Sequence, residues 1–174
     1  MNDEVRRYDF EDDGRIPNNP ELPLLVYPGT VDESERDPSR CKELLAGNGW
    51  GGSWVNGVFP YHHYHSTSHE VLVVVGGEAH LTFGGSEGET VEVGAGDAVV
   101  IPAGVGHCNE GSSHDFRVVG AYPRGQENYD LRTGEEGERP EVLENIRNVS
   151  LPETDPLYGR QGPILENWSG WLLA

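Results

Sequence analysis

Lysine is nearly absent from this sequence of 174 residues: Lys42 is the single example, and arginine supplies the other eleven basic residues. Thirty aspartates and glutamates outnumber these twelve, which gives a formal net charge of −18 at pH 7. Such a surface repels phosphate backbones and anionic membranes, so we expect neither nucleic acid nor a membrane as a partner. Because salt screens like charges, the composition favours a halophilic protein in a saline cytoplasm, with an acidic mesophilic protein as the alternative.

An export signal and long apolar segments are also lacking. The N-terminus is polar and has no apolar core of the kind that a signal peptide needs. The longest strictly apolar run, residues 71–75, is far too short to cross a bilayer. Only two cysteines are present, Cys41 and Cys108, and without export we expect reduced thiols. These absences predict a cytoplasmic protein.

Glycine and proline, by contrast, are abundant, with 24 and 12 residues. Between residues 54 and 122, glycine-bearing turns separate short β-type segments at spacings of about 8–12 residues, which is typical of an all-β sandwich or barrel. No helical period interrupts these segments. The predicted strands are 55–58, 61–65, 70–75, 79–83, 90–93, 98–101 and 116–122.

The residues before this region, 1–54, are expected to form an N-terminal arm. A short apolar run before a Pro-Gly turn predicts a strand over 22–27. Asp37 followed by Pro38 is the pattern of a helix N-cap with proline at the first helical position, and the helix is expected to end near Gly47.

The residues after it, 123–174, are expected to form a C-terminal arm with a helix over 140–149 and a docked apolar tail over 163–174. The chain as a whole is then one domain. The segment 70–75 is apolar on both faces, so a second layer must cover it, either the arms or another subunit. Together with the tryptophan-bearing tail, this segment favours a homodimer.

Four of the seven histidines fall within eight residues. In a strand, side chains two residues apart share a face, so His63 and His65 point the same way, and a bend over 66–68 lets Glu70 rejoin that face. Burying these three polar groups without partners in an apolar barrel interior would cost free energy. A divalent metal held by all three would remove that cost. His107 is the fourth candidate ligand, and only tertiary structure can bring it to the other three.

The spacing of these residues resembles the two sequence motifs of the cupin superfamily. The first motif is matched at every position by Gly57-x5-His63-x-His65-x4-Glu70-x6-Gly77. The second is matched in spacing by Gly96-x5-Pro102-x-Gly104-x2-His107. The second motif usually ends with asparagine, where this chain has Gly111, and Asn109 lies two residues earlier. This departure bears on substrate contacts rather than on metal binding.

The flanking sequences are similar to those of small stand-alone cupins of the YjlB type, at residues 17–20, 48–50 and 144–147. The resemblance implies a double-stranded β-helix, a jelly-roll-like barrel, with short helical arms. It also implies one divalent transition metal per chain, held by His63, His65, Glu70 and His107. Three nitrogens and one oxygen suit Fe, Mn, Ni, Cu or Zn.

The leading functional hypothesis is a metal-dependent, dioxygenase-like enzyme that acts on a small organic molecule inside the barrel. In this hypothesis Glu70 is a metal ligand, and it serves as a catalytic base when it detaches from the metal. A metal-dependent sugar isomerase or epimerase is one alternative. A non-enzymatic cupin that binds a metal or a small ligand is the other, because this scaffold hosts both classes.

The sequence does not settle the roles of several residues near the motifs. His62 and His69 fall on the opposite strand phase, so we expect them at the surface or behind the ligands. Cys108 is expected to be an ordinary core thiol, and Arg117 either binds a substrate carboxylate or forms a surface salt bridge. We expect the aromatic neighbours to pack in the core, and the alternative is that they line the rim of the cavity. These neighbours are Trp50, Trp54, Tyr61 and Tyr64.

Overall fold

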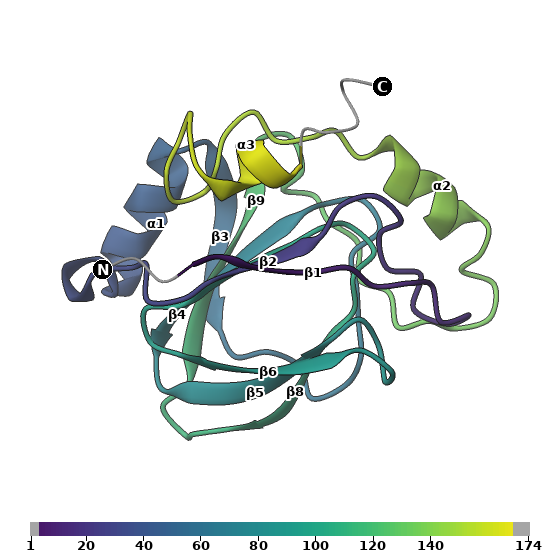
Figure 1. Ribbon diagram of the computed structural model, residues 1–174, viewed down its shortest axis with the longest axis horizontal. Helices are drawn as coiled ribbons and strands as arrows, with labels where there is room; N and C mark the ends of the chain where they lie inside the picture. Colours follow the sequence, from purple (N-terminus) through teal and green to yellow (C-terminus); the bar gives the residue numbers. More distant parts are fainter. Residues whose placement is uncertain (1–3, 169–174) are drawn as a thin grey trace.

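Two antiparallel sheets face each other in the computed structural model, which describes residues 4–168 (Figure 1). The larger sheet has six strands in the order β1-β2-β7-β4-β9-β3, and the smaller has three in the order β6-β5-β8. The strands are β1 (Arg6–Tyr8), β2 (Leu24–Tyr27), β3 (Trp50–Asn56), β4 (Glu70–Gly76), β5 (Glu78–Phe83), β6 (Glu89–Gly94), β7 (Ala98–Ile101), β8 (His107–Ser112) and β9 (Arg117–Pro123). The helices are the 3-10 helix η1 (Glu33–Glu35), α1 (Pro38–Gly47), α2 (Glu141–Asn148) and α3 (Pro163–Asn167). The predicted all-β, jelly-roll-like barrel is confirmed.

Alternating side chains of the two sheets fill the barrel interior. On β4, Leu72 and Val74 point inward and belong to the same buried cluster as Leu81 and Phe83 of the facing β5. Full burial of side chains of this size contributes roughly 1.5–3 kcal/mol each. Glu70 shares the inward phase of β4, so the alternation that builds the core also aims its carboxylate into the barrel.

The other face of β4 is covered by the arms of the same chain. Val71 and Val73 pack in a second buried cluster with Leu45 of α1 and Ile164 of α3. Figure 1 shows these two helices on the side of the six-stranded sheet that faces away from the smaller sheet. The two-faced apolar strand is therefore explained within one chain, and it no longer argues for a second subunit.

Both predicted helices are present. α1 spans the expected residues, and the Asp37 carboxylate caps its first turn. α2 occupies most of the range 140–149, and the strand expected over 22–27 is present as the shorter β2. β3 begins well before the predicted strand over 55–58, because β9 pairs with it along its length. In the part of the chain that the structure describes, no helix is long and apolar enough to span a membrane.

The predicted strand over 61–65 is wrong. Only isolated bridges form there, between His63 and His107 and between Tyr64 and Arg132. Consecutive residues thus pair with two different segments, so no ladder can extend along either one. β8, in contrast, forms where no strand is predicted, because pairing with β5 overrides the weak strand propensity of its asparagine and glycine.

The C-terminal arm is docked onto the larger sheet. Trp168 is 2% exposed, and its indole Nε1 donates a hydrogen bond to the Pro23 carbonyl at 2.8 Å. The buried carboxylate of Asp155 accepts a hydrogen bond from the Tyr27 hydroxyl at 2.6 Å. The prediction of a docked tail is confirmed as far as Trp168, and the rest of the range 163–174 lies outside the described residues.

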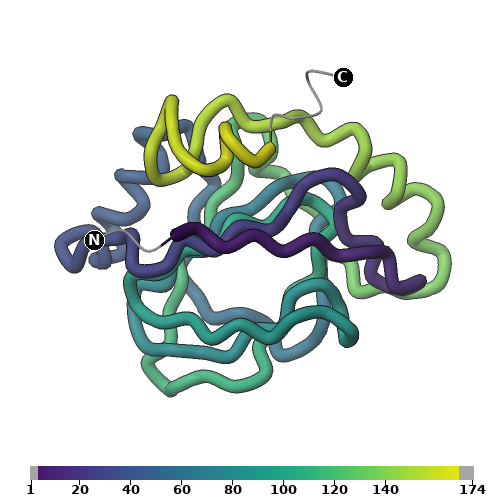
Figure 2. Tube along the Cα trace, in the orientation of Figure 1, coloured from purple at the N-terminus to yellow at the C-terminus, as the bar shows by residue number. Residues whose placement is uncertain are grey.

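The two arms also meet each other. Figure 2 shows the N-terminal segment that precedes β2 running beside the chain around residue 140, far away in sequence. Arg139 forms a two-pronged ion pair there with Asp12, with N···O distances of 2.6 and 2.8 Å. Asn18 holds the same segment to the smaller sheet, since its amide donates to the Gly84 carbonyl and accepts from the Gly106 backbone.

Candidate metal centre

Three of the four predicted metal ligands converge at one end of the barrel interior. Glu70 begins β4 and His107 begins β8, so the packing of the two sheets brings them together, and His65 reaches them from the loop before β4. Glu70 Oε1 lies 3.4 Å from His65 Nε2 and 3.3 Å from His107 Nε2, and all three side chains are buried. Their donor atoms lie within 4.8 Å of one another, a spacing that could hold a metal ion.

His63 lies beside this group. Its ring centre is 4.1 Å from that of His107 and 6.3 Å from that of His65, and the ring lines the same pocket. Its nitrogens are not part of the set that lies within 4.8 Å. The backbone bridge to His107 holds the two rings side by side, so His63 borders the site that the other three form.

The backbone fixes the same tautomer in all three cavity-facing histidines. Each Nδ1 lies against a backbone carbonyl, and because a carbonyl oxygen only accepts, Nδ1 must carry the proton. In the neutral ring the lone pair then sits on Nε2, which is how metal-ligating histidines are usually oriented. The pairs are His63 with Tyr61 at 2.9 Å, His107 with Val105 at 3.2 Å, and His65 with Asp130.

Glu70 is held at one carboxylate oxygen and left without a partner at the other. Oε2 accepts a hydrogen bond from the Tyr122 hydroxyl at 2.9 Å, and Trp54 Nε1 donates to that hydroxyl at 2.8 Å. Oε1 is buried and has no hydrogen bond of acceptable geometry, although two imidazole nitrogens face it. A divalent cation among these atoms would remove the cost of burying Oε1 unpaired, so the donor set fits a metal.

The charges of this group depend on one another. Burial lowers the pKa of His63 to about 3, and the neighbouring His107 ring acts in the same direction. Burial also opposes charge on His65, but the Glu70 carboxylate outweighs it and raises the pKa of His65. For Glu70, burial acts to raise the pKa, and the two facing imidazoles overcome it and lower that pKa. The carboxylate is thus ionised at neutral pH, as a metal ligand must be.

The centre opens into a pocket of about 440 Å³ with a largely apolar and aromatic wall. The Tyr129 ring stacks on Tyr122 at 4.2 Å between centres and meets the edge of His65 at 4.9 Å. Among the described residues, no arginine or lysine lines this pocket. Aliphatic and aromatic side chains complete its wall: Trp54, Val58, Phe59, Leu72 and Leu131.

Of the aromatic residues near the motifs, Trp54 forms part of the pocket wall and the others lie elsewhere. Trp50 is buried in the cluster behind the larger sheet, so the prediction that it packs in the core is confirmed. The Tyr64 hydroxyl donates a hydrogen bond to Glu138, away from the pocket. Tyr61 is 43% exposed and stacks on Phe59, whose ring reaches the pocket.

His69 does not lie at the surface, which was one of the two positions expected for it. It is fully buried on the far side of the sheet, with its ring centre 4.8 Å from that of Trp168. Its Nδ1 accepts a hydrogen bond from the Ala103 backbone, and burial lowers its pKa to about 3. Strand phase alone does not reveal that the C-terminal arm covers this face.

Arg117 is exposed and does not line the pocket.

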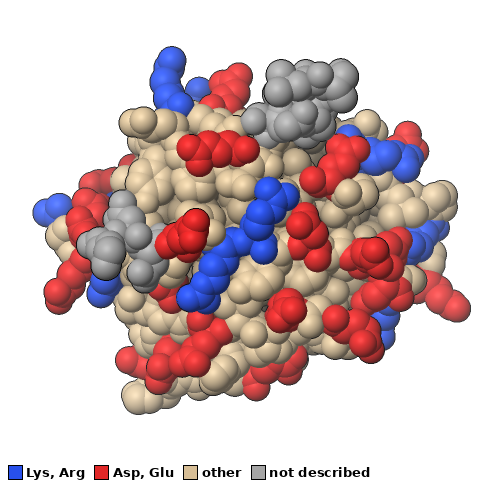
Figure 3. Space-filling model, viewed as in Figure 1, with Lys and Arg blue, Asp and Glu red and all other residues tan. Residues whose placement is uncertain are grey.

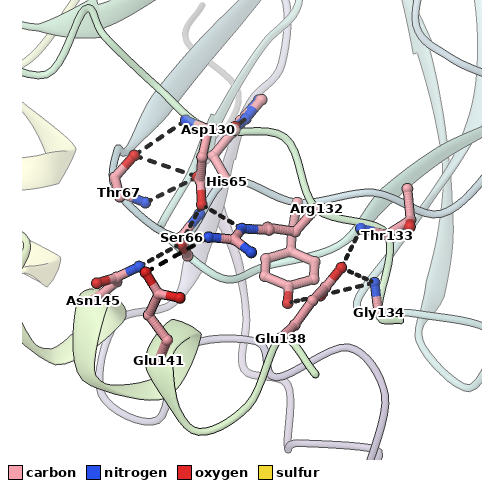
Figure 4. Close-up of polar contacts among 11 residues, drawn as sticks. His65, Ser66, Thr67, Asp130, Arg132, Thr133, Gly134, Glu138, Glu141 and Asn145 are labelled. Carbon is pink, nitrogen blue, oxygen red and sulfur yellow. Dashed lines mark hydrogen bonds and ion pairs between the residues drawn. The ribbon is translucent and has the colours of Figure 1, made fainter. Parts of the chain in front are cut away.

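Asp130 supports the site from a loop, and nothing in the sequence predicts it. Its backbone carbonyl faces His65 Nδ1, and its carboxylate accepts hydrogen bonds from the Ser66 backbone and hydroxyl (Figure 4). Arg132 Nε donates to the same carboxylate at 2.9 Å. The inward position of Tyr122, in contrast, could have been predicted from the sequence, because strand alternation in β9 places it on the same face as Val118.

Comparison with known proteins places this chain in a family. Residues 54–120 match the Cupin domain. The chain is 47% identical over 168 residues to the "Uncharacterized protein YjlB" of Bacillus subtilis (strain 168), and the match covers 97% of this chain and 99% of that relative. The chain belongs to the YjlB-type cupins. Cupins commonly bind a metal, and this cupin has a His/Glu group that could hold one.

Solved structures match this cupin at lower similarity. Acireductone dioxygenase from Bacillus anthracis, with a cadmium ion in its active centre, is 18% identical with a TM-score of 0.39, over 70% of this chain and 79% of that one. Procruciferin, an 11S globulin from Brassica napus, is 17% identical with a TM-score of 0.40, over 80% of this chain. The cupin spans 36% of the procruciferin chain. Neither likeness carries an argument about function.

Proposed function

We propose that His63, His65, Glu70 and His107 hold one divalent transition metal per chain, one of Fe, Mn, Ni, Cu or Zn. The observation that carries this proposal is the shared orientation of the histidines, with each Nδ1 against a backbone carbonyl. The unpartnered Glu70 Oε1 supplies the negative charge that a cation needs. His63, which borders the group, would complete the set by a movement of its ring.

We propose further that the substrate is a small, uncharged organic molecule that enters the apolar pocket above this centre. The pocket volume of about 440 Å³ suits a compact molecule, and its aromatic wall favours an apolar or ring-shaped one. A phosphorylated sugar would need a cationic partner, and no arginine or lysine lines the pocket within residues 4–168. A phosphorylated substrate for the sugar isomerase or epimerase alternative therefore has no support from the site.

The reaction that we propose is dioxygenase-like oxidation of such a substrate. The bound metal would polarise a substrate oxygen and, where it is redox-active, support chemistry with O2. Tyr122 holds Glu70 Oε2, and Oε1 can accept a proton from the substrate when the carboxylate detaches from the metal. Tyr129 and Trp54 exclude water from one side of the pocket and orient the substrate.

Metal analysis tests the first step of this proposal. His63→Ala, in protein purified without added metal, is expected to lose one equivalent relative to the wild type while the barrel stays folded. His80→Ala is the matched control, because His80 is exposed on β5 and lies outside the pocket. Equal metal content in His63→Ala and the wild type would show that the proposed set of four ligands is wrong.

Oxygen consumption tests the second step. The metal-loaded protein is expected to consume O2 with a panel of uncharged diketones and catechols, and Glu70→Gln is expected to abolish that consumption. Bound metal without turnover on any member of the panel, but with tight binding of one, would instead support the non-enzymatic ligand-binding cupin.

We also propose that residues 1–174 form one cupin domain, that the protein works in the cytoplasm and that it forms a homodimer. The arms support the first point, because they pack on the barrel through Leu45, Ile164 and Trp168. The homodimer stays a prediction, which the molecular mass in solution tests directly.

A further inference from the structure

The backbone bridge between His63 and His107 has an outer side that the proposed centre does not use. The two residues hydrogen bond to each other in both directions, with N···O distances of 3.1 and 2.9 Å. In an antiparallel bridge the next residues outward, His62 and Cys108, stand opposite each other. Because neighbouring side chains alternate, these two point away from the interior that His63 and His107 face.

Glu110 joins this pair on the outer side of β8. One ring nitrogen of His62, Sγ of Cys108 and a carboxylate oxygen of Glu110 all lie within 4.8 Å of one another. In a tetrahedral zinc site, ligand bonds of about 2.0–2.3 Å separate the ligand atoms by about 3.5 Å. Glu110 is exposed, so rotation of its side chain can close the remaining gap.

Two of these donors have poor partners within the protein. His62 Nδ1 is buried and makes no hydrogen bond. Cys108 is 4% exposed, and its Sγ makes a long contact of 3.9 Å with the Asn109 carbonyl. Buried polar atoms without partners are costly, and a cation bound at His62 Nδ1 would remove that cost.

The three residues line a cleft of about 650 Å³ between β8 and the N-terminal segment, to which Asp13 and Ile16 contribute. None of the three lines the pocket of the inner centre. An ion can therefore reach the outer side of β8 without passing through the barrel.

We propose that His62, Cys108 and Glu110 form a second cation site, selective for a zinc-type divalent ion, back to back with the inner centre. Thiolate, imidazole and carboxylate are the donors that Zn²⁺ takes in proteins. Three protein ligands leave a fourth position that opens into the cleft. The two sites share no side chain, so this site does not depend on the proposed function of the inner one.

Cadmium or cobalt titration of the full chain, stripped of metal and kept reduced, tests the proposal. The inner centre contains no sulfur, so only the outer site can give sulfur-to-metal charge-transfer absorption. We expect this absorption to saturate by two equivalents in the wild type, when both sites are filled, and to vanish in Cys108→Ser. Glu70→Gln is expected to keep it, which separates failure of the inner centre from failure of the outer one.

Glu110→Gln is the second variant, and it leaves the buried residues intact. We expect it to weaken cadmium binding, followed by the same absorption, at least tenfold, since weakening even an outer partner of a ligand costs about 10–100-fold. Cys41→Ser and Glu43→Gln in α1 are the matched controls and should bind as the wild type does. The proposal is overturned if the wild type gives no charge-transfer band, if the band survives in Cys108→Ser, or if Glu110→Gln binds with unchanged affinity.

Discussion

At the scale of single residues, the hydroxyl of Tyr122 connects the pocket wall to the candidate metal centre. It donates to Glu70 Oε2 and accepts from Trp54 Nε1, and so it fixes the carboxylate in the orientation that leaves Oε1 free. Partners that orient a metal ligand in this way affect metal affinity without touching the ion.

Tyr122→Phe is therefore expected to weaken metal binding by about 10–100-fold while the fold is kept. Competition with a chelator of known affinity measures this change. Tyr158→Phe is the control, because Tyr158 is 41% exposed and does not line the pocket. Equal affinities in the wild type and Tyr122→Phe would mean that Glu70 needs no such support.

Gly120 makes room for the Trp54 ring on the inner face of β9. A Cβ at this position would lie 2.3 Å from Trp54 Cζ2, so Gly120→Ala must displace the indole. We expect a loss of about 1–3 kcal/mol in the free energy of unfolding, measured by urea denaturation, together with a shift in tryptophan fluorescence. Gly111→Ala is the control, since nothing lies within 4 Å of its added methyl group. Similar stability of the two variants would contradict this role.

Two histidines mark the limit of what could be predicted at this scale. Strand alternation correctly separates His62 from its neighbour His63, because that rule depends only on local backbone geometry. The same rule says nothing of what covers an outward face, and so it missed the complete burial of His69 under Trp168. The loop residue Asp130 has no periodic pattern at all, and only tertiary structure shows its place behind His65.

At the scale of elements, the loop between β9 and α2 is held in place by Glu138. Its carboxylate accepts hydrogen bonds from the Tyr64 hydroxyl and from the backbones of Thr133 and Gly134, as Figure 4 shows for part of this network. Partial burial acts to raise the pKa of Glu138, but these hydrogen bonds outweigh it and hold the pKa below its usual value of 4.5.

A carboxylate with a lowered pKa stabilises the fold above its unfolded-state pKa, and this contribution disappears as the pH falls through the folded-state pKa. Glu138→Gln is expected to lower the free energy of unfolding by roughly 1–3 kcal/mol at pH 7. The difference from the wild type should shrink below about pH 4.5. Denaturant unfolding between pH 3 and pH 7 measures both effects, with the exposed Glu136→Gln as control. A difference that stays constant with pH would rule out the ionised carboxylate as the cause.

The elements show why some predictions succeeded and one failed. α1 could be predicted from its cap and its proline, and β4 from a run of apolar residues, because both signals are local. The segment 61–65 has strand-like residues, but its backbone pairs with β8 at His63 and with Arg132 at Tyr64. Pairing partners depend on the assembled fold, so a strand pattern alone could not show that the ladder breaks there.

At the scale of the whole molecule, acidic side chains far outnumber basic ones. Figure 3 shows them spread over most of the visible face, with a small basic group over β1, whose sequence begins with two arginines. At −18, repulsion among these charges opposes the compact state. The halophilic character inferred from this composition stays a prediction.

Added salt should therefore stabilise the protein. Between about 0.1 and 1 M KCl the Debye length falls from about 10 to about 3 Å, which screens most of this repulsion. We expect the urea midpoint of unfolding to rise over this range, and protein with its metal removed should show the same trend. A midpoint that is flat or falls with salt would favour the acidic mesophilic alternative.

The covered position of β4 has a kinetic consequence. This strand lies between β7 and β9 with both faces buried, so its amide hydrogens should exchange with solvent only through the rarest openings of the molecule. Glu70 is the first residue of that strand. A chelator should therefore leave the carboxylate already in place, and the emptied protein should rebind metal without refolding.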